Sequence, residues 1–77
     1  MSTLMWEARA AAGRLDELVE YVLNNADPSA QVYRSDMDDS RVVVIDPTGR
    51  GVGEVPAGLL ARPAHAWAFD PVARDTT

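Results

Sequence analysis

Four consecutive β-branched apolar residues, Val42 to Ile45, form the feature that most constrains how this chain can fold. They lie within Asp36–Asp46, between an acidic polar turn and a Pro-Thr-Gly turn. A run this short and this apolar is typical of a strand that is buried on both faces. Val42 and Val44 would then face one layer and Val43 and Ile45 another, so each face of this strand needs a cover.

The chain has 77 residues and no cysteine, which favours one small domain without disulfides or thiolate metal sites. A domain near this size buries only about 60% of the surface of its unfolded chain, so its stability margin is thin. Self-association is the most available way to bury more apolar surface. We expect a single domain over residues 1–72 and a disordered tail over residues 73–77.

Twelve acidic and seven basic residues give a net charge of −5, which makes nucleic acid an unfavourable partner. The longest apolar runs are too short to span a membrane, and the N-terminus does not read as a signal peptide. The cytoplasm is therefore the expected location. All seven basic residues are arginine, which together with the many alanines is typical of a GC-rich bacterial genome.

Two kinds of periodicity define the first half of the chain. Thr3–Ala10 alternates, with Leu4, Trp6, Ala8 and Ala10 on one side, and predicts a strand. From Arg14 the period changes to that of a helix, which we expect to end at Asn25. Its apolar stripe consists of Leu15, Leu18, Val19, Val22 and Leu23.

The second half predicts three further strands and a short helix. Ser29–Ser35 and Arg41–Asp46 read as a hairpin joined by a polar, Asp-rich turn. A glycine-rich loop follows, and Pro56 suits the first turn of a short helix that ends at Arg62-Pro63. Ala64–Val72 alternates strictly and predicts the last strand, with His65, Trp67 and Phe69 on one face.

The element order is therefore β-α-β-β-α-β, that of an α+β ferredoxin-like domain. It has a four-stranded antiparallel sheet, with one long and one short helix on one face. A right-handed crossover places the third strand between the first and second, so the first and third strands become central. The helices cover one face of the sheet. We expect a second copy of the protein to cover the other, giving a homodimer.

Two stretches, Trp6–Val22 and Val32–Ile45, resemble the antibiotic biosynthesis monooxygenase family of small dimeric α/β-barrel proteins. They carry the acidic amphipathic helix GRLDELVEYV, then VYRS, an Asp-rich turn and a short apolar strand. The resemblance implies ferredoxin-like subunits whose sheets pack face to face across a two-fold axis. It also implies cofactor-independent oxygenation of quinols or aromatic polyketides, or haem binding in related members.

The working residues of that family commonly include an Asn on the first strand, a Trp, and a His or Tyr. The first strand of this chain has no Asn and offers Thr3, Glu7 and Arg9 instead. His65 and Trp67 match the His and Trp of that family in residue type. They lie two residues apart on a strand, however, rather than on the long helix that the family uses. A short member that keeps the dimeric fold without the enzyme is the expectation that follows.

The candidate site residues are aromatic or charged. His65 and Trp67 share a strand face and could stack a planar ligand, although aromatics at this spacing are more often packing. Glu7 and Arg9 share a face of a central strand, where they could form an ion pair or an anion-binding site. Arg34 and Arg41 on the flanking strands could join them. The candidate pocket residues are His65, Trp67, Phe69, Trp6, Tyr33, Glu7 and Arg9.

Two hypotheses for function follow. The first is a non-catalytic dimeric protein that binds a small molecule or a protein partner. The second is a cofactor-independent monooxygenase acting on a quinol or aromatic polyketide. The monooxygenase requires a polar group in a closed pocket. A shortened second helix leaves little of the chain to form the wall of such a pocket. No cofactor or metal site is predicted.

Overall fold

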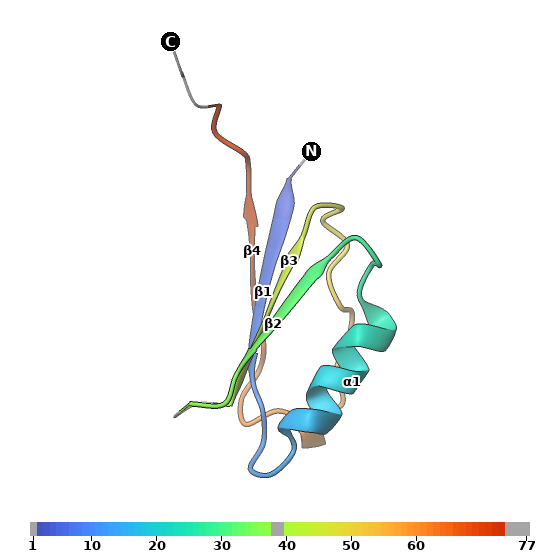
Figure 1. Ribbon diagram of the computed structural model, residues 1–77, viewed down its shortest axis with the longest axis vertical. Helices are drawn as coiled ribbons and strands as arrows, with labels where there is room; N and C mark the ends of the chain where they lie inside the picture. The colour runs from blue at the N-terminus through green and yellow to red at the C-terminus, as the bar shows by residue number, and fades with distance from the viewer. Residues whose placement is uncertain (1, 38–39, 74–77) are drawn as a thin grey trace.

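Four antiparallel strands form one sheet, and a single α-helix packs against one of its faces (Figure 1). The computed structural model describes residues 2–37 and 40–73, so the last four residues of the expected tail lie outside the described part. The elements in chain order are β1 (Thr3–Arg9), α1 (Leu15–Asn25), β2 (Gln31–Ser35), β3 (Arg41–Asp46), the 3-10 helix η1 (Ala57–Leu59) and β4 (His65–Phe69).

The strand order is β2-β3-β1-β4, with every neighbouring pair antiparallel. β1 and β3 are therefore the central strands, as their sequences predict. The register pairs Trp6 with Val44 on one side of β1 and with Ala66 on the other. The α+β class is confirmed, and the arrangement is compatible with a ferredoxin-like domain.

The two faces of β3 lie in different surroundings, as the Val42–Ile45 run predicts. Val42 and Val44 are completely buried on the side of the helix. Val43 and Ile45 point to the opposite side, where they are only partly buried. One face of the central strand is thus covered within the chain, and the other lacks an equivalent layer.

Helix α1 lies over β2 and β3 and buries the centre of the stripe that its sequence predicts. Leu18 and Val22 have no exposed surface, and Leu15 and Val19 are partly buried. The placement of Leu23 in that stripe is wrong, because its side chain is 62% exposed. The first turn holds Arg14 and Glu17 together through two hydrogen bonds of 2.8 and 2.9 Å. At the other end the amide of Ala26 donates to the carbonyl of Val22, and extended backbone follows.

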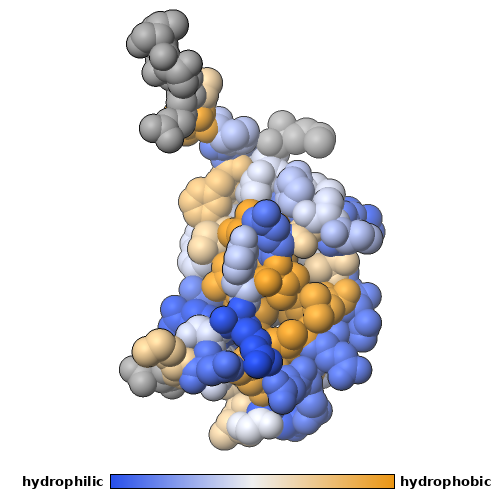
Figure 2. Space-filling view, viewed as in Figure 1, coloured by the Kyte–Doolittle hydropathy of each residue, from blue (hydrophilic) through white to orange (hydrophobic). Residues whose placement is uncertain are grey.

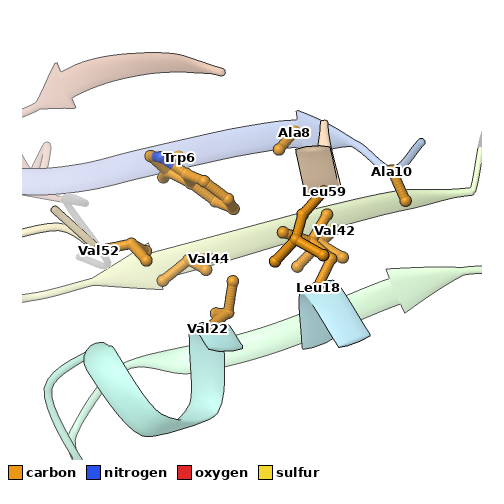
Figure 3. Packing of buried hydrophobic residues seen from close by; sticks show 9 residues of the cluster. All are labelled: Trp6, Ala8, Ala10, Leu18, Val22, Val42, Val44, Val52 and Leu59. Atoms are coloured by element: carbon orange, nitrogen blue, oxygen red, sulfur yellow. The ribbon is translucent and has the colours of Figure 1, made fainter. Parts of the chain in front are cut away.

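The hydrophobic core fills the space between the sheet and the helix (Figure 3). Val22 and Leu18 point from α1 toward the valines of β3 (Figure 3). Trp6 and Val52 close one end of the core, and Leu59 of η1 closes the other (Figure 3). Apolar surface remains visible between the sheet and the helix, with hydrophilic residues around it (Figure 2).

Two elements are shorter than their sequences predict. The second helix is a single 3-10 turn, Ala57–Leu59, because glycines precede it and Pro56 and Pro63 bracket it. The last strand covers His65–Phe69 rather than Ala64–Val72. It ends there because β1 begins at Thr3, the partner of Phe69, so later residues have no strand to pair with.

Across residues 2–37 and 40–73, no helix is both long and apolar enough to cross a membrane.

The core makes a direct test of the fold possible within one helix. We expect Leu18→Ala to lower the free energy of unfolding by about 3 kcal/mol, because it removes a fully buried side chain and leaves a cavity. Leu23→Ala is the matched control, with an expected change within about 0.5 kcal/mol. Urea unfolding followed by circular dichroism measures both. Equal effects of the two substitutions would contradict the observed helix orientation.

Candidate functional site

The face of the sheet that points away from α1 carries most of the candidate residues, and we call it the open face. Alternation along each strand and the pairing registers place them there. The open face consists of Thr3, Met5, Glu7 and Arg9 of β1, Gln31, Tyr33 and Ser35 of β2, Arg41, Val43 and Ile45 of β3, and His65, Trp67 and Phe69 of β4.

His65, Trp67 and Phe69 form an aromatic row along the edge strand β4. The rings of His65 and Trp67 stack with centroids 5.8 Å apart and planes inclined by 12°. Trp67 is 45% exposed and Phe69 is 50% exposed. Aromatic rings of this size are normally buried more completely, so this row is an unusual feature of the surface.

An ion pair joins the two central strands on the open face, toward the end where β1 finishes and β3 begins. A guanidinium nitrogen of Arg41 on β3 is 3.5 Å from a carboxylate oxygen of Glu7 on β1. The Glu7 side chain is only 19% exposed, so this contact is shielded from water more than a typical surface pair. Arg9 lies on the same face, at the end of β1, where its Cα pairs with that of Arg41.

Arg34 does not join this group, because it lies on the helix side of β2. Its guanidinium contacts Asp16 of α1 at 2.9 Å and Asp36 at 3.7 Å. Tyr33, the preceding residue, is on the open face and 55% exposed, with its hydroxyl donating to Gln31 at 3.0 Å. The sequence alone leaves the face of Arg34 undetermined, and the register of β2 on β3 decides it.

The grouping of Trp6 with the other candidate residues is wrong. Trp6 lies on the helix side of β1 and is 5% exposed in the hydrophobic core. Its neighbour Glu7 points to the open face, because successive side chains on a strand project to opposite sides. The remaining candidates, His65, Trp67, Phe69, Tyr33, Glu7 and Arg9, are together on the open face.

Chemically, the open face is a broad apolar and aromatic surface, with the Glu7–Arg41 ion pair and Arg9 toward one end of its central strands. The exposed rings of Trp67, Phe69 and Tyr33 are not enclosed by other parts of the described chain. A closed, water-excluding pocket is what oxygenation of an aromatic substrate would require. The surface is suited instead to contact with another extended surface.

A second feature, absent from the sequence predictions, is the buried acid Asp46 at the end of β3. One carboxylate oxygen of Asp46 accepts from the amide and the hydroxyl of Thr48, at 2.8 and 2.6 Å. The other accepts from the amide of Gly51 at 2.7 Å. Burial by itself raises the pKa of Asp46, but these hydrogen bonds and the Arg50 charge outweigh it, so the pKa is lowered.

The same motif occurs a second time, at Asp27. Its carboxylate accepts from the amide and hydroxyl of Ser29, at 2.9 and 2.6 Å, and these bonds lower its pKa. Arg50 lies 3.6 Å from Asp27 and links the two turns. The repeated Asp-Pro-Ser/Thr triplet is the sequence signal that could have identified both acids. Together they hold the glycine-rich loop that leads to η1 and β4.

No family model matches the chain, and no curated protein or solved structure matches it either. The class of protein is therefore defined by its architecture: a small α+β domain with a four-stranded antiparallel sheet, one helix and one open sheet face. The resemblance to the monooxygenase family stays a hypothesis that depends on sequence features alone.

We expect Asp46→Asn to lower the free energy of unfolding by about 1 to 3 kcal/mol near neutral pH. The amide that replaces one carboxylate oxygen places an N–H group where an acceptor is needed for Gly51 or Thr48. Because the pKa of Asp46 is lowered on folding, its contribution is present above the ordinary carboxyl pKa of about 4. It is lost as the pH falls through the lowered value.

The difference in stability between wild type and Asp46→Asn should therefore shrink as the pH is lowered below about 4. Urea unfolding at several pH values measures it. Glu20→Gln, at an exposed acid on α1, is the control for a general change of net charge. A difference that grows with acid, or an equal effect of the control, would contradict the role of Asp46.

Proposed function

We propose that the protein is a non-catalytic homodimeric module, and that two copies pack their open faces against each other across a two-fold axis. The observation that carries this proposal is the exposed aromatic and apolar layer on the uncovered side of the sheet, above all Trp67, Phe69 and Tyr33. The same proposal interprets the fold as a ferredoxin-like domain whose second helix is reduced to one turn.

The size of the open face supports a second copy as its occupant. Four strands about 4.8 Å apart and about six residues long give a flat area of about 20 by 20 Å. Side-chain relief increases the accessible area beyond this flat value. The result approaches the lower end of stable interfaces, which bury about 600 to 800 Å² per partner. A much larger partner surface is not needed to cover the face.

The charges on the open face also fit a symmetric partner. Glu7 and Arg41 already neutralise each other within one chain, so this pair can be brought to an interface, and Arg9 adds one further positive charge at the end of β1. A two-fold axis near this pair would bring the acid of each copy close to the arginine of the other. Aromatic rings and arginine are the side chains most enriched at the centres of protein interfaces.

A monooxygenase is less well supported, because the residues that it would use lie on an open surface. His65 and Trp67 lie on an edge strand and are solvent-exposed. Packing against a second copy would cover these rings further. We retain the cytoplasm as the proposed location, which the cysteine-free composition favours.

Sedimentation and light scattering at micromolar concentration test the dimer. We expect a mass of twice 8.3 kDa for the wild type. Val43→Glu should shift it toward the monomer, because it places an additional acid in the apolar layer that the second copy would cover. We expect the dimer dissociation constant to rise at least about tenfold, as one misplaced interfacial charge commonly costs more than 1.4 kcal/mol.

Leu23→Glu is the matched control, since it adds the same charge at an exposed position on the outer side of α1. Its mass should equal that of the wild type. A wild-type monomer of 8.3 kDa would overturn the proposal. So would an unchanged dimer dissociation constant in Val43→Glu, because the interface would then lie elsewhere, for example along the edge of β2. Circular dichroism confirms that each variant is folded.

A further inference from the structure

A second apolar surface lies on the helix side of the sheet, next to β4. Helix α1 covers β2 and β3, and β4 lies at the opposite edge of the sheet. Ala66 and Ala68 point to the helix side from β4, and both are exposed. The single turn of η1 is too short to cover this part of the sheet. A hollow lies beside η1, lined by residues from Gly53 to Ala64, just before β4 begins.

This hollow has a cavity volume of about 480 Å³, and its lining is mostly apolar. Val55, Leu60 and Ala64 form its floor, and all three pack against the hydrophobic core. Ala57 of η1 and Pro63 form walls. The volume is within the range of about 300 to 1,000 Å³ that is typical of small-molecule sites.

The hollow is next to a segment, residues 60–65, whose pairing with β1 is irregular. Ala10 bridges to Leu60, whereas the register of β4 on β1 would pair Ala10 with Arg62. Two extra residues are therefore accommodated between Leu60 and His65. Pro63 lies in this irregular segment, where its missing N–H costs no ladder bond. The irregularity places Arg62 at the edge of the hollow.

Arg62 gives the hollow a charge. Its side chain lines the cavity and is exposed, and among residues 2–37 and 40–73 it has no ion-pair partner. The other arginines in that part of the chain have acidic partners or other contacts. Glu54 and Asp70 are equally near to Arg62 in sequence. Glu54 lines a neighbouring depression with Tyr21, and Asp70 accepts a hydrogen bond from the hydroxyl of Ser2. An apolar cavity with a single cation at its rim matches a ligand with an apolar body and one negative charge.

We propose that this hollow is a binding site for small amphiphilic carboxylates, with the apolar body against Val55, Leu60 and Ala64 and the carboxylate at Arg62. The site is on the opposite side of the sheet from the open face, so the inference does not depend on the homodimer. Its occupant takes the place that a full second helix would fill, and the burial of its apolar body supplies most of the affinity.

Octanoate is the probe, with octanol and octylamine as the uncharged and oppositely charged ligands of equal chain length. Titration is followed by amide chemical shifts in two-dimensional NMR spectra. We expect saturable binding of octanoate with shift changes centred on Val55, Leu60 and Ala64. Octanol should bind about fivefold more weakly, since an exposed ion pair contributes up to about that factor. Octylamine should bind more weakly still.

Two variants separate the charge from the cavity. Arg62→Gln should weaken octanoate about fivefold and leave octanol unchanged. Arg34→Gln, with the same change of net charge on β2 at the opposite edge of the sheet, is its control. Ala57→Trp should fill the hollow and abolish binding of both ligands, whereas Ala73→Trp, at an exposed position far along the chain, should not.

Equal affinities for octanoate and octanol, or an unchanged octanoate affinity in Arg62→Gln, would overturn the assignment of a carboxylate ligand. Absence of saturation, or shift changes centred on Trp67 and Phe69, would overturn the site itself. Repeating the titration on Val43→Glu keeps the two proposals distinguishable. Binding of octanoate by that variant supports the hollow, whatever the oligomeric state of the variant. Loss of binding in that variant alone would contradict the proposal that the hollow is independent of the dimer.

Discussion

The rest of this structure depends on the need to cover a central strand on both faces. Val42 and Val44 are completely buried against α1 and the residues that close the core, whereas Val43 and Ile45 lie on the open face. Apolar burial stabilises by about 25 cal/mol per Å², and a domain of this size has few other sources of stability. The described residues supply an incomplete layer on the helix side of this sheet and no layer on the other side. The uncovered surfaces are therefore the most informative features of the molecule.

The sequence predicts those parts of the fold that have a clear pattern. The bounds of β3 match the prediction at both ends, because polar turns flank its apolar run. The bounds of α1 differ by one residue, because its 3.6-residue period continues long enough to be recognised. The faces of His65, Trp67 and Phe69 follow from alternation in the same way. The second helix is less predictable, since Pro56 and the two leucines are compatible with either a short α-helix or the observed 3-10 turn.

Most of the candidate site could be predicted from the sequence, and the exceptions have identifiable causes. Alternation already places Trp6 and Glu7 on opposite sides of β1, so a group that contains both cannot be one surface. Whether Arg34 lies with Glu7 depends on the register between β2 and β3, which no single sequence period encodes. The role of Asp46 depends on hydrogen bonds to the backbone of Thr48 and Gly51, in a loop without periodicity. Its only local signal is the Asp-Pro-Thr triplet and its counterpart at Asp27.

The turn at Asp46 connects the core to both proposed surfaces. Its carboxylate fixes the start of the loop that ends at η1, and that loop supplies Val52 to the core and Val55 to the hollow. A longer loop-to-helix connection at this position would cover the helix side of β4, but it would leave the open face unchanged. The two uncovered surfaces thus have different physical origins. The hollow results from a short connection on one side of the sheet. The open face results from the absence of any connecting segment on the other side among residues 2–37 and 40–73.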